Sequence, residues 1–144
     1  CRLYATDMNE DALQKAANGA FPLAAMREHT SRYLAAGGQR SFSEYYAVRH
    51  GTAVFQPRLR RNVVFAQHNL VTDHSFNEFN AILCRNVLIY FSRPLQERVH
   101  RLLYESLGRL GFLGLGSKET VQFTPFERRY QTVDAANKLY RKVG

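Results

Sequence analysis

The stretch ILCRNVLIYF (residues 82–91) decides the fold class of this 144-residue chain. It begins with three apolar residues, as a buried strand does, and then places Arg85 and Asn86 together before the apolar run resumes. A charge and an amide are costly in the middle of a buried strand, but they are acceptable at its end. The pattern therefore predicts a strand that ends at Cys84, with Arg85 and Asn86 at its carboxyl end and a loop over residues 87–91.

The segments after this loop predict a helix, a strand and a closing hairpin. Ser92 and Pro94 suit a first helical turn, and apolar residues continue at helical spacing as far as Leu110. GFLGLGSKE (residues 111–119) predicts a glycine-rich strand that ends in polar residues. RYQTVDAANKLYRKV (residues 129–143) predicts an antiparallel hairpin.

The segments before the loop predict one half of a parallel α/β unit and a small antiparallel insertion. Residues 3–5 have the composition of a short buried strand, Asn9 is a good N-cap, and Gly19 stands where a helix would end. Residues 22–36 suit one or two short helices. Residues 42–70 are rich in aromatic and β-branched side chains, with a turn at His50-Gly51 and a last strand in NVVFAQHN (residues 62–69).

Together these elements predict an α/β fold with an open, mostly parallel sheet and a small inserted antiparallel subdomain at residues 40–62. Ligands bind such sheets beyond the carboxyl ends of the strands, where Asp7, Asn69, Arg85, Asn86 and residues 117–119 fall. Asp7 could accept hydrogen bonds from a ribose or cap the following helix, and the spacing leaves both open. Asn69 could pair with a base edge or serve as a turn residue.

Composition limits the function classes further. The net charge of +8 favours acidic partners, which include nucleic acid, anionic membranes and acidic proteins. The apolar runs are too short for a transmembrane helix, and two distant cysteines predict neither a disulfide framework nor a zinc site, which favours the cytoplasm. Phosphate-binding glycine loops, zinc-protease motifs and the nucleophile elbow do not occur, and no metal is expected.

ILCRNVLIYFSRPLQERV (residues 82–99) resembles the strongest motif of the CheR-type methyltransferases, which use S-adenosylmethionine to methylate glutamate side chains of bacterial chemoreceptors. YATDMNEDALQKA, FAQHNL and GLGSKE are similar to further segments of that family, so that the resemblance covers nearly the whole chain. It implies a Rossmann-like methyltransferase sheet with a C-terminal antiparallel hairpin.

The resemblance also implies roles for individual residues. Asp7 would bind the cofactor ribose, and Asn69 and Leu70 would meet the adenine. Arg85 and Asn86 would line the cofactor side of the pocket. Tyr90 would lie near the reactive sulfonium and steady the cationic methyl group. From the residues alone, Tyr90 could instead belong to the core, and Arg85 could be a structural ion-pair partner.

Compared with that family, the chain opens at the second strand, so the first strand, its glycine-rich loop and the N-terminal helical domain are expected to be missing. The chain should then bind the cofactor weakly, and two copies could pair through the two sheet edges left open. The expected substrate is the acidic helical cytoplasmic domain of a chemoreceptor, without membrane insertion or nucleic acid. The alternative is a non-catalytic receptor-binding or signalling module with the same fold, and a nucleic-acid methyltransferase is a weaker third.

Overall fold

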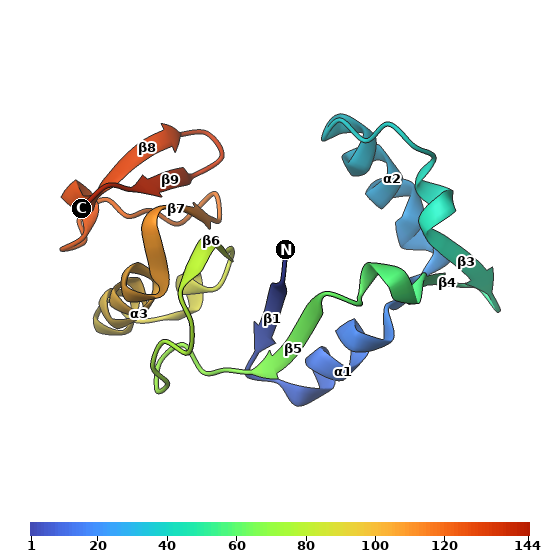
Figure 1. Cartoon of the computed structure of the whole chain (residues 1–144), viewed down its shortest axis with the longest axis horizontal. Helices are drawn as coiled ribbons and strands as arrows, with labels where there is room; N and C mark the ends of the chain where they lie inside the picture. Colours follow the sequence, from blue (N-terminus) through green and yellow to red (C-terminus); the bar gives the residue numbers. More distant parts are fainter. The chain divides into compact units, whose positions relative to one another are not determined.

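Two units make up the chain in the computed structural model, which describes residues 1–144: Cys1–Asn69 and Leu70–Gly144 (Figure 1). The first unit contains a parallel strand pair with its helix and a three-stranded antiparallel sheet. The second contains a four-stranded mixed sheet and one long helix. The predicted mixture of parallel pairs, an antiparallel insertion and a closing hairpin is therefore confirmed.

In the first unit, β1 (Leu3–Asp7) pairs in parallel with β5 (Val63–Gln67), and α1 (Glu10–Asn18) packs against both strands. The Asn9 side chain accepts hydrogen bonds from the N–H groups of Asp11 and Ala12, and Gly19 ends the helix at φ 62°. Both predicted caps are confirmed, because local side-chain geometry determines them.

The prediction that β1 is buried is wrong, since Leu3 is 58% exposed. Within its unit, β1 has a hydrogen-bonded neighbour along one edge, which is β5, and α1 is the helix packed against this pair. Apolar sequence therefore identified the strand correctly but overestimated how much of it is covered here.

The antiparallel insertion forms the sheet β2-β4-β3, made of β2 (Ala20–Pro22), β4 (Thr52–Phe55) and β3 (Tyr46–Arg49). The predicted turn is confirmed, because His50 and Gly51 take φ values of 47° and 73° between β3 and β4. The sheet also recruits β2, which lies outside the predicted range 40–62. The boundaries of an inserted subdomain therefore stay a prediction.

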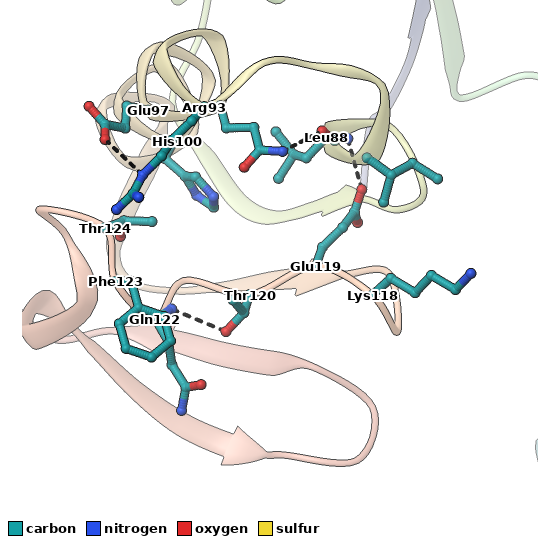
Figure 2. Close-up of a pocket in the computed structure, with 12 residues that line it drawn as sticks. Leu88, Arg93, Glu97, His100, Lys118, Glu119, Thr120, Gln122, Phe123 and Thr124 are labelled. Carbon is teal, nitrogen blue, oxygen red and sulfur yellow. Dashed lines mark hydrogen bonds and ion pairs between the residues drawn. The ribbon is translucent and has the colours of Figure 1, made fainter.

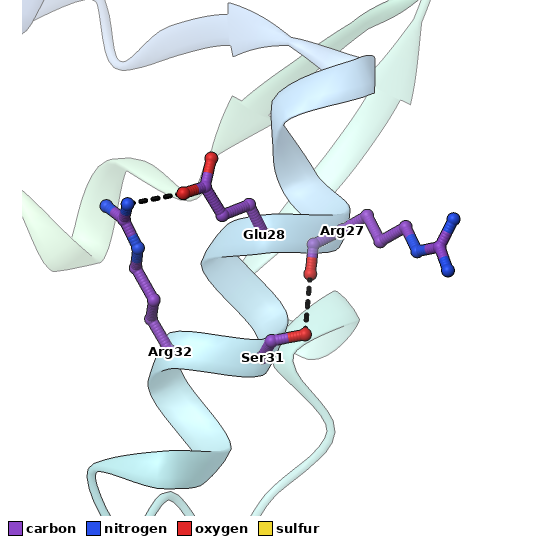
Figure 3. A network of polar contacts seen from close by, with 4 residues as sticks. All are labelled: Arg27, Glu28, Ser31 and Arg32. Atoms are coloured by element: carbon purple, nitrogen blue, oxygen red, sulfur yellow. Dashed lines mark hydrogen bonds and ion pairs between the residues drawn. The ribbon is translucent and has the colours of Figure 1, made fainter.

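The predicted short helices are η1 (Leu23–Ala25) and α2 (Met26–Ala35), and α2 carries a local polar network on its exposed side. Figure 3 shows Glu28 paired with Arg32 and the Ser31 hydroxyl donating to the Arg27 carbonyl oxygen, four residues earlier in each case. Exposed pairs at this spacing stabilise a helix by only about 0.3–0.5 kcal/mol. This network supports the helix and is not a site. Short turns elsewhere in the first unit are η2 (Phe42–Tyr45) and η3 (Pro57–Leu59).

The second unit is built on β6 (Phe79–Cys84) and β7 (Leu107–Leu115), which run parallel, with α3 (Arg93–Ser106) between them in sequence. β9 (Leu139–Lys142) pairs antiparallel with β7, and β8 (Tyr130–Asp134) follows it at the edge. The fully buried side chains of its core come from α3 and β7: Val99, Leu107, Leu113 and Leu115. The remaining short turns are η4 (Leu88–Tyr90) and η5 (Glu127–Arg129).

The helical stripe predicted to reach Leu110 ends earlier, at Ser106. Leu110 lies in β7, where it is 46% exposed and takes φ 62°. The pairing of β6 with β7 is interrupted here, because Phe79 faces Leu107 while Ala81 faces Phe112. Gly108 and Gly111 flank this irregularity, and glycine weakens helices while tolerating such bulges.

Candidate active site

The carboxyl end of β6 carries the two polar residues that interrupt the apolar run. β6 ends at Cys84, as predicted, and Arg85 and Asn86 follow it with exposed side chains. Asn86 takes φ 61°, a left-handed conformation that asparagine tolerates better than most residues. Arg85 forms no ion pair with an acidic side chain. The structure therefore does not support the alternative in which Arg85 is a structural ion-pair partner.

The loop after Asn86 is held by the buried carboxylate of Glu119. The sequence places Glu119 among the polar residues at the strand ends but does not predict this contact. Its Oε2 accepts from the N–H groups of Asn86 (3.0 Å) and Gly116 (2.6 Å). Its Oε1 accepts from the N–H groups of Val87 and Leu88, at 2.8 Å each. Four backbone donors thus converge on one carboxylate that is 5% exposed. We call this arrangement the Glu119 brace.

Gly116 allows the ends of β6 and β7 to approach closely. A Cβ atom at this position would contact the Asn86 side-chain oxygen, and it would lie 2.7 Å from Glu119 Oε2 and 2.8 Å from the Asn86 nitrogen. Only glycine fits without a shift of these groups. The brace therefore depends on Gly116 as well as on the acceptor itself.

Tyr90 stands on this braced loop and is 80% exposed. The exposure excludes the alternative in which Tyr90 belongs to the core. The Gln96 side chain of α3 steadies the loop from its other end, because its Nε2 donates to the carbonyl oxygens of Leu88 (3.0 Å) and Phe91 (3.1 Å). The loop thus presents Tyr90 to solvent from a backbone hydrogen-bonded on both sides.

The other predicted site residues are divided between the two units. In the first unit, Asp7 ends β1, and its Oδ1 accepts from the Asn9 N–H at 2.8 Å, while Asn9 itself caps α1. β1 and β5 run in parallel, so Asp7 at the end of β1 and Asn69 just after β5 lie at the same end of this pair, where the His68 N–H also donates to the Asp7 carbonyl oxygen at 3.1 Å. In the second unit, Leu70 packs against the hydrophobic core.

Comparison with known proteins identifies the family. A model of the CheR methyltransferase SAM-binding domain matches residues 1–138. The chain belongs to this family. It is 44% identical, over 97% of its length, to the Pseudomonas putida protein Cher3, named as a methyltransferase, and covers 51% of that protein. It is 30% identical to the chemotaxis protein methyltransferase of Salmonella typhimurium, covering 95% of this chain and 48% of that protein. The chain thus spans about half the length of these curated relatives.

A solved structure of PKMT2 from Rickettsia typhi in complex with AdoHcy also resembles this CheR-family chain, with a TM-score of 0.45 and 13% identity. The resemblance covers 79% of this chain and 16% of that one. None of the helices has the length and apolar character needed to cross a membrane.

S-adenosylmethionine is the cofactor of the CheR SAM-binding domain, as predicted. The polar residues at the carboxyl ends of β1 and β6 are of the kinds that could contact this cofactor. Asp7 keeps an exposed carboxylate whose Oδ1 is already oriented by Asn9, and Arg85 and Asn86 stand exposed beside the close approach at Gly116. The individual roles of Asp7, Asn69, Leu70, Arg85, Asn86 and Tyr90 stay predictions.

Two titratable groups near the brace are shifted by their surroundings. Burial raises the pKa of the Cys84 thiol to about 12, and the nearby Glu119 carboxylate adds to this rise. Burial lowers the pKa of His100, while Glu119 opposes the shift. Both groups are therefore neutral at pH 7.5.

We expect alkylation to distinguish the two cysteines. Iodoacetamide reacts with thiolates, so at pH 8 it should modify the exposed Cys1 and leave Cys84 unmodified in the folded chain. Peptide mass mapping after a timed reaction measures this, with a urea-unfolded sample as the control in which both cysteines react. Equal labelling of both in the folded chain would show that Cys84 is not buried.

Proposed function

We propose that this domain is the cofactor-binding part of an S-adenosylmethionine-dependent O-methyltransferase that forms glutamate methyl esters on bacterial chemoreceptors in the cytoplasm. The observation that carries the proposal is the Glu119 brace. It holds Arg85, Asn86 and Tyr90 exposed at one strand end. Packing of the core does not require polar residues at these positions. Family membership and the chemotaxis methyltransferase names of relatives add support.

The chemistry asks little of the protein beyond alignment. A glutamate side chain has a pKa of about 4.3, so at neutral pH it is an anionic nucleophile and needs no general base. S-adenosylmethionine, when bound, supplies a methyl group whose transfer to the carboxylate oxygen breaks the methyl–sulfur bond and leaves S-adenosylhomocysteine. The exposed Tyr90 would steady the cationic methyl group, and Arg85 and Asn86 would orient the cofactor.

Cofactor binding by Asp7 tests the proposal directly. We expect Asp7→Asn to weaken the binding of S-adenosylhomocysteine about 10- to 100-fold, since charge-assisted hydrogen bonds contribute about 1.5–3 kcal/mol. Asparagine keeps the side-chain oxygen that accepts from the Asn9 N–H, so α1 should remain capped. Isothermal titration of the natural gene product gives the affinities.

Asp11→Asn is the matched control, because Asp11 is an exposed carboxylate in the first turn of α1 that the proposal does not use. The reaction itself is tested with S-adenosylmethionine labelled in its methyl group and a chemoreceptor cytoplasmic fragment. A carboxyl methyl ester releases labelled methanol in alkali, whereas an N-methyl product does not. Labelling that resists alkali, or wild-type affinity in Asp7→Asn, would refute the proposal.

Tyr90 is proposed as the catalytic residue. We expect Tyr90→Ala to lower kcat about 10- to 100-fold with little change in stability, because the side chain is 80% exposed. Tyr90→Phe keeps the ring and separates its contribution from that of the hydroxyl. Initial rates of methyl transfer at saturating cofactor measure both variants. Wild-type turnover in both would remove Tyr90 from the mechanism.

The basic surface supports an acidic helical partner, since the chain carries a net charge of +8. The alternative, a receptor-binding module without catalysis, predicts receptor binding that does not depend on Asp7.

β1 and β6 are both terminal strands in their sheets, so the pairing of two copies through these edges also stays a prediction. Sedimentation over a range of concentrations tests it, and a monomer at all concentrations would exclude it.

A further inference from the structure

A cavity of about 370 Å³ in the second unit lies outside the predicted cofactor residues. It is lined by the N-terminal half of α3, by the loop residues Leu88 and Ile89, and by the segment after β7. Figure 2 shows Arg93, Glu97 and His100 on one side and Thr120, Phe123 and Thr124 on the other. The cavity adjoins the braced loop that carries Tyr90.

His100 is a buried polar side chain that opens on this cavity. It is 4% exposed and makes no hydrogen bond within the protein. Three buried side-chain atoms are both unpaired and cut off from solvent: Arg60 Nε, the Tyr130 hydroxyl oxygen and Arg141 Nε. The His100 nitrogens are not among them, and His100 lines the cavity, so its ring can reach a ligand there. A buried polar group without a protein partner is costly unless water or a ligand pairs with it.

The unpaired hydrogen-bond donors around the cavity favour an anion. Arg93 and Lys118 lie at its rim with exposed side chains. The Glu119 carboxylate already accepts four backbone N–H groups. Glu97 faces Arg93 at 3.9 Å, a long contact between exposed side chains that contributes little. The lining thus holds two basic and two acidic side chains, and Lys118 and the His100 ring are its groups without a partner in the protein.

Two exposed apolar side chains border the same cavity, which favours an anion with an aliphatic stem. Ile89 is 43% exposed and Phe123 is 83% exposed. Phe123 takes φ 62°, an uncommon backbone conformation for a bulky residue, and its N–H donates to Glu127 Oε2 at 2.9 Å. Strained residues of this kind cluster at functional sites, where the surrounding structure holds them. A glutamate side chain combines a carboxylate with such a stem.

We infer that this cavity binds the carboxylate of a second acidic side chain in the methyl-accepting protein, one that flanks the glutamate to be methylated. The inference rests on the proposed function, and it names a specificity site distinct from the cofactor residues. Arg93 and Lys118 bind the carboxylate, His100 donates to it from the cavity wall, and Ile89 and Phe123 pack against the stem. The site thus selects a glutamate that stands in an acidic neighbourhood.

The experiment follows the imidazole signals of the five histidines by ¹H–¹³C NMR. The probe is N-acetyl-L-glutamate N-methylamide, and the uncharged comparison is N-acetyl-L-glutamine N-methylamide. His100→Gln identifies the His100 signal. We expect saturable shifts of this signal with the glutamate probe, in the millimolar range, and no saturable shifts with the glutamine probe. A bound carboxylate should also raise the pKa of His100. This rise is measured relative to the free protein, in which Arg93, Lys118, Glu97 and Glu119 already line the cavity beside the imidazole.

Charge-removing variants locate the site. Arg93→Gln and Lys118→Gln should each weaken the glutamate probe by roughly threefold to tenfold. Arg98→Gln is the matched control, since Arg98 is exposed on the same helix but does not line the cavity, and its affinity should equal that of the wild type. Inorganic phosphate is a separate arm, and it should bind more weakly because it has no stem.

Equal shifts with glutamate and glutamine probes, wild-type affinity in both Arg93→Gln and Lys118→Gln, or tighter binding of phosphate would each overturn the inference. Calorimetry with S-adenosylhomocysteine, and alkali-labile labelling of the receptor fragment by the natural gene product, report the proposed function separately. If these succeed while the glutamate probe fails, the acidic-side-chain site alone is refuted. If the probe binds while they fail, the proposed function is refuted and the cavity remains a carboxylate site of another purpose.

Discussion

Replacing Glu119 by alanine is expected to lower the free energy of unfolding by about 3–5 kcal/mol. The variant removes the acceptor of four backbone N–H groups, on Asn86, Val87, Leu88 and Gly116. Hydrogen bonds to a charged group contribute about 1.5–3 kcal/mol each, and donors left unpaired in a buried place add a further cost. Water entering the space left by the side chain limits the total.

Urea unfolding followed by far-UV circular dichroism measures this loss, since the chain has no tryptophan. Glu119→Gln should lie between the wild type and Glu119→Ala, because one oxygen remains an acceptor while the new NH₂ group faces N–H donors. Glu105→Ala is the matched control on exposed helix surface and should stay within about 0.5 kcal/mol of the wild type. A loss below about 1 kcal/mol in Glu119→Ala would mean that the brace does not hold the loop.

The same variant should also impair cofactor binding, although Glu119 is not among the predicted cofactor residues. Without the brace, the loop that presents Arg85, Asn86 and Tyr90 loses its fixed backbone. Binding then requires ordering this loop, which costs conformational entropy. A stability loss with unchanged affinity for S-adenosylhomocysteine would separate the brace from the cofactor site.

Sequence reasoning succeeded where a local interaction determines the structure. The end of β6 at Cys84, the Asn9 and Gly19 caps of α1 and the turn at His50 each depend on a few neighbouring residues. Such features can be inferred because backbone preference and hydrogen bonding act over short separations.

The Glu119 brace could not be inferred in the same way, because the carboxylate and the loop it holds are more than thirty residues apart in sequence. The sequence predicts GLGSKE as a strand with a polar end. The spacing of its residues does not predict that Glu119 contacts the backbone of Asn86. One signal was available. A turn packed into a core must find acceptors for its N–H groups, and Glu119 is the one carboxylate in that polar end.

Burial was the least predictable quantity. The apolar letters of residues 3–5 and 82–84 suggested covered strands, but Leu3 is 58% exposed and Leu83 is 77% exposed. Apolar sequence reports which side chains favour an interior, whereas exposure depends on which elements are present to cover them. The same reasoning explains Leu110, whose helical spacing was coincidental because the nearby Gly108 and Gly111 favour the bulge in β7.

Replacing Gly116 by alanine tests the brace from the opposite strand. The added Cβ would contact the Asn86 side-chain oxygen and lie 2.7 Å from Glu119 Oε2, so both groups must move. Overpacking of this kind costs about 1–3 kcal/mol. Because Asn86 is displaced, we also expect affinity for S-adenosylhomocysteine to fall about tenfold or more, as measured by urea unfolding and isothermal titration.

Gly108→Ala is the matched control in the same strand, since its Cβ would meet only the flexible end of the Glu78 side chain, at 3.2 Å from Oε1. The double variant with Glu119→Ala gives the stricter result. Residues in contact do not contribute additively, and the alanine at position 119 removes one of the atoms with which the new Cβ collides. Gly116→Ala should therefore cost less in the Glu119→Ala background than in the wild type. Strict additivity would mean that the glycine and the carboxylate act on the loop independently, in which case the close approach of β6 and β7 would not be part of the brace.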